Sequence, residues 1–191
     1  MYNQEDRRIR KTKKALRNEL IELLNEKNIQ NITVKELTDK ADIHRSTFYA
    51  NFKDVYDLYS HMEDTVIQEI KDLVSIDYTF KPTAFFHSLL SYVNENRQIS
   101  RLFLSGNIGT AFFEQLTEMF KDACIECWCK EHNVTNISDE MSHYVQFCFS
   151  GGLGVIGMWV AEGFQYPIEA LAKILSDIDS NVGKIIGEKL K

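Results

Sequence analysis

Residues 32–58 read ITVKELTDKADIHRSTFYANFKDVYDL, the part of the chain with the most regular pattern. Thr33 is a good helix N-cap and Glu36 follows three residues later, so a helix with a capping box is expected to begin here. Asp42 interrupts this helix, and a second short helix is expected over residues 44–50. Two short helices joined by a tight turn form the helix-turn-helix arrangement.

The second short helix needs support from its neighbours, because a helix of about seven residues does not hold itself together in water. Ile43, Phe48 and Phe52 supply apolar anchors that can fix it. The side chains left facing outwards can all donate hydrogen bonds to base edges or phosphates. They are His44, Arg45, Ser46, Thr47 and Tyr49. This pattern predicts a recognition helix for DNA.

The helix expected before this stretch, over residues 5–27, is basic at its start. Its first part holds seven Lys and Arg residues against Glu5 and Asp6. Residues 1–60 carry 12 basic and 10 acidic side chains, a net +2, whereas residues 61–191 carry 10 and 18, a net −8. A basic run alone is usually only a solvated helix face. Beside a recognition helix it favours a module that binds a polyanion.

These residues resemble the DNA-binding segment of the tetracycline-repressor (TetR/AcrR) family of bacterial transcription regulators, over about residues 7–62. The stretch STFYANF after an Ala-x-Ile turn is the most specific part of the resemblance. Asp42 stands where the family often has Gly, but Asp tolerates a left-handed backbone, so the turn can still form. Val55 stands where the family often has a Lys that meets the DNA backbone, and Lys53 is the available substitute.

The resemblance implies an all-α protein of about nine helices with two domains. Residues 1–60 would be a three-helix DNA-binding domain containing the helix-turn-helix. Residues 61–191 would be a helical domain that binds an effector and forms the dimer. Thr33 and Tyr49 would each contact a phosphate, and the recognition helix would face bases or phosphates. The DNA-binding residues so implied are Thr33, His44, Arg45, Ser46, Thr47, Tyr49 and Lys53.

The C-terminal part, from about residue 82, reads as five more helices, two of which open near Pro82 and Pro167. Its segments FLSGNIG and FSGGLGVIGMWVAEGF resemble the branch of the family that includes regulators similar to the dihydroxyacetone-kinase activator. The region is rich in aromatic residues, most of which are expected in the core. Some are expected to line an effector site, since such sites combine aromatic side chains with a few polar groups. The candidates are Phe86, Phe103, Phe120, Trp128, Tyr144 and Phe147.

The last two expected helices predict a homodimer. Small residues recur at helical spacing in the first, which allows another helix to approach closely; they are Ser150, Gly154, Gly157 and Ala161. Apolar residues form an a/d-type seam in the second; they are Leu171, Leu175, Ile178, Val182 and Ile185. Two such helices from each chain can form a four-helix bundle with twofold symmetry. The small residues can also pack within their own chain.

Two other patterns are found in nucleotide-binding, metal-binding or catalytic sites. Residues 152–157 match the dinucleotide motif GxGxxG, but the motif needs a strand before it and parallel strands around it, which the sequence does not offer. Metal sensing, or a catalytic cysteine with a histidine base, would need paired ligands or a third orienting group. The Cys and His residues concerned are Cys124, Cys127, Cys129, His132 and His143. We therefore expect no enzyme, no cofactor and no metal site.

The composition excludes other classes of protein. The sequence has no run of about 18 apolar residues, so no membrane span is expected. The charged N-terminus is unlike a signal peptide. A cytoplasmic protein with reduced cysteines is therefore expected. The prediction is a regulator, most simply a repressor, that binds palindromic operator DNA as a homodimer and responds to a small molecule. The alternative is a DNA-binding regulator or activator controlled by a protein partner. The effector, the operator and the sign of regulation do not follow from the sequence.

Overall fold

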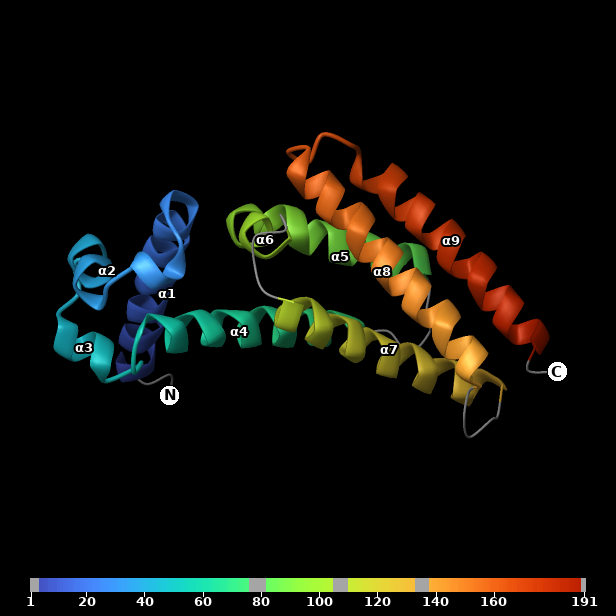
Figure 1. The fold of residues 1–191 in the computed structure, drawn as a ribbon, viewed down its shortest axis with the longest axis horizontal. Helices are drawn as coiled ribbons and strands as arrows, with labels where there is room; N and C mark the ends of the chain where they lie inside the picture. The colour runs from blue at the N-terminus through green and yellow to red at the C-terminus, as the bar shows by residue number, and fades with distance from the viewer. Residues whose placement is uncertain (1–3, 76–81, 105–109, 133–137, 190–191) are drawn as a thin grey trace. The chain divides into compact units, whose positions relative to one another are not determined.

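The computed structural model describes residues 4–75, 82–104, 110–132 and 138–189, and every regular element in these ranges is helical. The prediction of an all-α fold with about nine helices is confirmed for this part of the chain. The elements are α1 (Gln4–Glu26), the short 3₁₀ turn η1 (Ile29–Asn31), α2 (Val34–Lys40), α3 (Arg45–Tyr49), α4 (Val55–Ser75), α5 (Pro82–Glu95), α6 (Arg97–Leu104), α7 (Thr110–His132), α8 (Asp139–Ala161) and α9 (Ile168–Lys189) (Figure 1).

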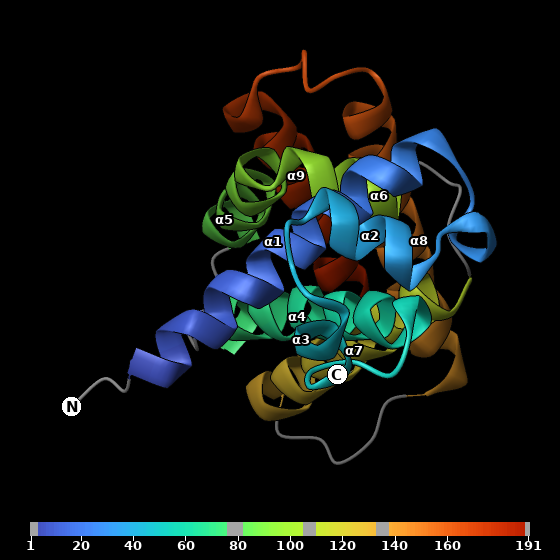
Figure 2. The same ribbon diagram turned by 90° about the vertical axis from the view of Figure 1, so that its left-hand side faces the viewer.

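The chain divides into two compact units, Met1–Val66 and Ile67–Lys191, and the division falls within α4. The first unit holds the helix-turn-helix segment, whose helices α2 and α3 are labelled in Figure 2. Its core is made of the apolar stripe of α1 and of one inward face from each following helix. The fully or almost fully buried residues there include Leu16, Leu20, Leu23, Leu37, Phe48, Leu58 and Met62.

The second unit is built around α5, α8 and α9. Helix α5 packs along α9, where the hydroxyl oxygens of Thr83 and Ser176 lie 2.7 Å apart, and α8 packs against α6, α7 and α9 (Figure 1). Each of these helices buries one apolar stripe. The core includes Leu90, Val93, Ile99, Leu116, Val145, Ile156, Trp159, Leu171, Leu175 and Ile186. These contacts fix α6 at the end of α5 and beside α8.

By length and composition alone, one helix in the described part of the chain, α8, could cross a membrane, although the sequence predicted no such span. Only 22% of its most apolar window is buried inside the chain. The same helix packs on three neighbours and buries Val145, Ile156 and Trp159 among them, as the core helix of a folded domain does. Its remaining apolar surface is described below.

Candidate nucleic-acid interface and aromatic cluster

At the start of α2, the hydroxyl group of Thr33 is available as a hydrogen-bond donor. Thr33 is the N-cap, and its Oγ1 accepts a hydrogen bond of 3.2 Å from the backbone N–H of Glu36. The Glu36 carboxylate, expected to close a capping box, instead binds Lys27 Nζ at 2.6 and 2.7 Å and so ties α2 to the end of α1. This bond with Lys27 lowers the pKa of Glu36. Thr33 can therefore accept from its own helix and donate to a phosphate at once.

The turn between α2 and α3 has the left-handed residue that the sequence predicted. Asp42 has φ 52°, and the next residue, Ile43, donates its backbone N–H to the carbonyl of Thr38 at 3.0 Å. Thr38 is buried, and its hydroxyl donates back to the carbonyl of Val34 at 2.7 Å. The turn is held by backbone and side-chain bonds together, which fixes the start of α3.

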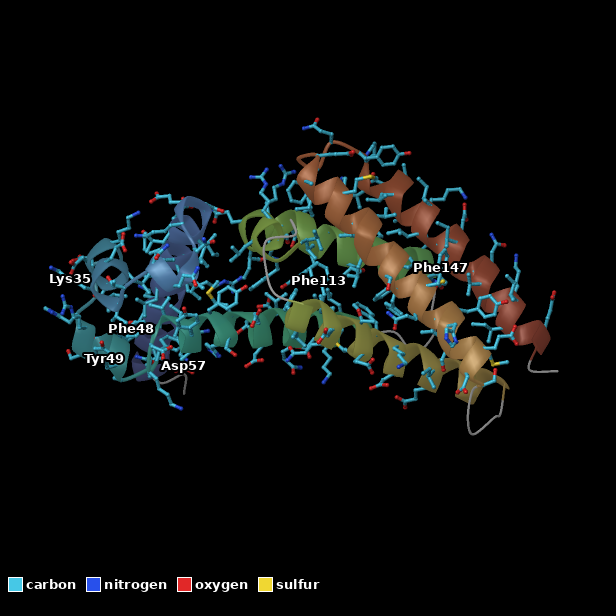
Figure 3. The ribbon with its side chains drawn as sticks, in the orientation of Figure 1. Lys35, Phe48, Tyr49, Asp57, Phe113 and Phe147 are labelled. Carbon is cyan, nitrogen blue, oxygen red and sulfur yellow. The ribbon has the colours of Figure 1, made fainter. Side chains whose placement is uncertain are left out.

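Helix α3 presents most of its predicted contact residues to solvent. His44 is its N-cap and makes no side-chain capping bond, and Arg45 and Ser46 are exposed in the first turn. Phe48 is fully buried, whereas Tyr49 beside it is 58% exposed (Figure 3). Thr47 is half-buried, at the edge of the exposed face. A buried Phe48 thus anchors a short helix whose other side is a row of hydrogen-bond donors.

The start of α4 carries two carboxylates that are engaged locally. Asp54 Oδ1 accepts from the backbone N–H of Asp57 at 2.9 Å, and Asp57 Oδ2 accepts from the backbone N–H of Lys53 at 2.8 Å. The Lys53 side chain itself is exposed. Two further exposed side chains in this unit, Lys35 in the first turn of α2 and Tyr56 in that of α4, are not among the contact residues predicted from the sequence. Their positions in first helical turns were the available signal.

One basic side chain of α1 contacts both the segment between α3 and α4 and α4 itself. Lys13 Nζ lies 5.6 Å from the centre of the Phe52 ring and 3.5 Å from Nε2 of His61. The Phe52 and His61 rings are themselves 5.6 Å apart. The basic part of α1 and the segment that follows α3 are therefore parts of one packed surface within this unit.

In the second unit, aromatic rings from α5, α7 and α8 meet. The Phe85 ring centre lies 5.2 Å from that of Phe86 and 5.8 Å from that of Phe120. Phe120 stacks on Phe149 at 5.1 Å. We call Phe85, Phe86, Phe120 and Phe149 the aromatic cluster.

The structure brings together only part of the predicted effector-binding set. Phe86 and Phe120 belong to the aromatic cluster. Phe103 is buried and stacks on Phe112 at 4.6 Å. Tyr144 is half-buried, and Phe147 is 69% exposed on α8 (Figure 3). The Trp128 side chain lies outside the described residues.

The patterns weighed for other chemistry gain no support from the structure. Residues 152–157 lie inside α8, with no strand before them as the dinucleotide motif requires. His143 Nδ1 lies 2.6 Å from the carbonyl oxygen of Asp139 one turn earlier. Among the side chains that the structure describes, no group of three could hold a metal ion. The side chains of Cys124, Cys127, Cys129 and His132 are outside that set.

Helices α8 and α9 leave an apolar surface open to solvent in the single chain, which we call the outer face. It is made of large apolar side chains separated by glycines at which a Cβ would meet nothing within 4 Å. The side chains are Phe147, Met158, Ile174, Ile178 and Ile185, and the glycines are Gly151 and Gly154.

Both stripes predicted for this surface are divided between the outer face and the chain's own core. In α8, Gly154 is exposed, whereas a Cβ on Gly157 would lie 3.1 Å from the carbonyl oxygen of Leu104 in α6. In α9, Leu171 and Leu175 are buried within the chain, whereas Ile178 and Ile185 remain exposed. Helical spacing revealed the apolar residues but not which neighbour covers each.

Comparison with known proteins places the chain in a family. The TetR-type family described as "Transcriptional regulator C-terminal region" matches residues 81–180. An uncharacterized HTH-type transcriptional regulator of Bacillus subtilis, YxbF, is 27% identical over 188 residues, which cover 95% of this chain and 48% of the relative. The chain thus spans about half the length of this curated relative.

The fold is that of known regulators. A TetR transcriptional regulator from Streptococcus agalactiae superimposes with a TM-score of 0.65 at 21% identity, covering 91% of this chain and 96% of the other. The dihydroxyacetone kinase operon activator DhaS has a TM-score of 0.58 at 17% identity, covering 92% and 96%. With the family match over its C-terminal half and the helix-turn-helix geometry before it, this chain belongs to the TetR family of transcriptional regulators.

Proposed function

We propose that this regulator binds palindromic operator DNA as a homodimer, represses transcription there, and is released by a small-molecule effector. The observation that carries the proposal is α3: Phe48 is fully buried while Arg45, Ser46 and Tyr49 on the same short helix are exposed. A firmly anchored helix with an outer row of donors suits insertion into the major groove.

The proposed contacts fall into two classes. Arg45, with His44 and Ser46 beside it, would read base edges, because a guanidinium can bind guanine through two hydrogen bonds. Thr33, Tyr49 and Lys53 would bind phosphates and set the position of the helix, with Thr47 at the edge of the contact. We add Lys35 and Tyr56 to the phosphate class, since both are exposed in first helical turns of the same unit.

The homodimer is proposed to form through the outer face. Phe147 is 69% exposed and Met158 55% exposed, values that are costly for such side chains unless another surface covers them. The exposed glycines of α8 would let a helix of the second copy approach closely. A twofold dimer would place two recognition helices on two halves of a palindrome.

The effector is proposed to be a small, largely apolar molecule bound at the aromatic cluster. Phe85 and Phe86 are half-buried there, so a ligand could reach ring surface that the core does not already fill. The cluster joins α5, α7 and α8, and a ligand that prefers one arrangement of these helices would shift the population of that arrangement. Phe147 belongs to the outer face in this proposal, not to the effector site.

A second candidate is a regulator or activator controlled by a protein partner at the outer face. The neighbour DhaS is named an operon activator, so the fold serves activation as well. Both candidates place the protein in the cytoplasm and give it no catalytic role. Melting-temperature screens with metabolites distinguish the two candidates. A small-molecule effector that binds the folded chain raises its melting temperature, whereas a regulator controlled by a protein partner shows no such rise with any metabolite.

Selection from random double-stranded DNA with the whole chain tests the main proposal. The expected result is an enriched palindrome with two half-sites about one helical turn, or a multiple of it, apart. Binding that shows no sequence preference above the salt-dependent background, or enrichment of a single unpaired half-site, would reject it.

A further inference from the structure

The turn after α8 holds a phenylalanine in an unusual backbone conformation. Phe164 has φ 64°, in the left-handed region, which is uncommon for a bulky residue. Its backbone N–H donates to the carbonyl of Trp159 at 2.9 Å, and its ring meets the Trp159 ring edge-on at 5.1 Å. The side chain is only 8% exposed. Contacts around the ring must stabilise a conformation that the backbone alone disfavours.

Two cations of α6 supply further contacts to the same ring. The guanidinium carbons of Arg97 and Arg101 lie 4.7 and 5.4 Å from the centre of the Phe164 ring. The two arginines are four residues apart and so share one face of α6. Both distances are within the range of cation–π attraction. Phe164 therefore lies between Trp159 at the end of α8 and two positive charges of α6.

The other end of α6 also rests on α8. Gly157 approaches the carbonyl oxygen of Leu104, the last residue of α6, so closely that a Cβ would stand 3.1 Å from it. Helix α6 spans only eight residues, Arg97–Leu104. A helix this short takes its position from its neighbours. Its position is set by α8 at one end and by the turn after α8 at the other.

Helix α5 has hydrogen bonds both to Arg97 of α6 and to α4. Arg97 donates to Asn94 Oδ1 through Nη2 at 2.7 Å and Nε at 3.1 Å, across the corner between α5 and α6. Tyr92, in the same turn of α5, donates its hydroxyl to Glu69 Oε2 of α4 at 2.6 Å. All these residues belong to the second unit. The contacts of Arg97 and those of Tyr92 are joined through the backbone of α5, which carries both Asn94 and Tyr92.

We propose that Phe164 is a latch that holds α6 and the α5–α6 corner on the end of α8, and that this latch couples α8 to α4. Phe164 and Arg97 act here as positioning residues, without contact to DNA or effector. The latch itself lies within the second unit alone. Its coupling through α4 to the DNA-binding unit rests on the proposed function.

Hydrogen exchange on the whole, DNA-free chain tests the latch. Phe164→Leu keeps apolar bulk but removes the ring face, while Phe164→Tyr keeps the ring and is the matched control. Loss of the cation–π contacts is worth a factor of about two to five for each. We expect Phe164→Leu to speed exchange at least about threefold in residues 97–104 and 67–73, and Phe164→Tyr to resemble the wild type.

The double variant Arg97→Met, Arg101→Met removes both cations from the Phe164 ring, together with the bonds from Arg97 to Asn94, at exposed positions where folding is not at risk. It should reproduce the exchange pattern of Phe164→Leu, and adding Phe164→Leu to it should change little. Faster exchange confined to residues 162–167 in Phe164→Leu, with residues 97–104 within twofold of the wild type, would overturn the latch.

Operator affinity then tests the coupling separately from the proposed function. Phe164→Leu and Tyr92→Phe should each change affinity for the selected operator at least about threefold in the same direction, and the double variant no more than the larger single effect. Unchanged affinity in both, with the exchange pattern confirmed, would overturn the coupling to α4 and leave the latch. A wild-type chain that binds no operator, with the exchange pattern confirmed, would reject the proposed function and the coupling built on it, while the latch within the second unit would stand.

Discussion

Gly157 of α8 and Leu104 of α6 are in backbone contact: a Cβ added to Gly157 would lie 3.1 Å from the Leu104 carbonyl oxygen. Gly183 of α9 offers the comparison, since a Cβ there would meet nothing within 4 Å. Replacing Gly by Ala inside a helix gains about 0.5–1 kcal/mol when space allows. The two glycines therefore separate a helix-propensity effect from a packing effect.

We expect Gly183→Ala to raise the free energy of unfolding by about 0.5–1 kcal/mol, and Gly157→Ala to raise it by less or to lower it. Gly157→Leu should lower it by about 1–3 kcal/mol, because the added atoms must displace the end of α6. Urea unfolding at one protein concentration measures all three. Equal stabilisation by the two alanine variants would show that α6 does not press on Gly157.

Asp179 of α9 makes stability depend on pH. Burial raises its pKa from 3.8 to about 6. The folded chain thus holds this proton more tightly than the unfolded chain, so this carboxyl costs no stability below about pH 4 and lowers the free energy of unfolding as pH rises to about 6. Above that pH the cost is constant, on the order of 2–3 kcal/mol. Cys148 nearby stays a neutral thiol, since burial and Asp179 raise its pKa to about 11.

Asp179→Asn should therefore stabilise the chain at pH 7.5 and change little at pH 4. Urea unfolding of both proteins at pH 4, 6 and 7.5 measures the difference. A variant that is equally stabilised, or equally destabilised, at all three pH values would show that burial does not raise the pKa of this carboxyl.

Substitutions of Thr33 and Lys35 should weaken DNA binding in different ways. Thr33→Val removes the N-cap acceptor of α2, at a cost of about 1 kcal/mol in stability, and a neutral phosphate contact. Its salt dependence of binding should match the wild type. Lys35→Met should leave stability unchanged and reduce the slope of log affinity against log salt by about one. Thr33→Ser keeps the hydroxyl and is the control. An unchanged slope for Lys35→Met would remove Lys35 from the interface.

The outer face should fail as an interface when it is charged. Phe147→Glu and Ile178→Glu place a carboxylate among exposed apolar side chains, and burying one unpaired in a dimer costs about 3 kcal/mol, or about a hundredfold in the dissociation constant. His87→Glu, at an exposed position of α5, is the control and should leave the dimer intact. Analytical ultracentrifugation measures this. A wild-type monomer at micromolar concentration would contradict the proposed dimer.

Local sequence signals predicted the helix-turn-helix well, because its geometry depends on neighbouring residues. Thr33 has the N-cap bond that its type suggests, and Asp42 has the left-handed backbone that replaces the family's glycine. Phe48 and Tyr49 divide between core and solvent as expected for adjacent positions on a short helix. Each of these features is set within a few residues of the chain.

Features that depend on distant segments were not predictable in the same way. The Glu36 carboxylate binds Lys27, nine residues away and just beyond the end of α1, where the sequence indicated a local bond. Periodicity placed Gly154 and Gly157 in one stripe, although only Gly157 has a neighbour in its own chain. The contact of Phe164 with Arg97 joins residues far apart in the sequence, and nothing in either local pattern indicates it.

The most direct test of the central claim is a comparison of Arg45→Ala and Tyr49→Phe with the wild type on the selected operator and on variants with each base pair changed in turn. We predict that Arg45→Ala loses about 1–3 kcal/mol of affinity for the operator and no longer discriminates at one base pair per half-site. Tyr49→Phe should bind all the sequences more weakly by a similar factor. If Arg45→Ala kept both the affinity and the base preference of the wild type, the exposed face of α3 would not be the surface that reads DNA.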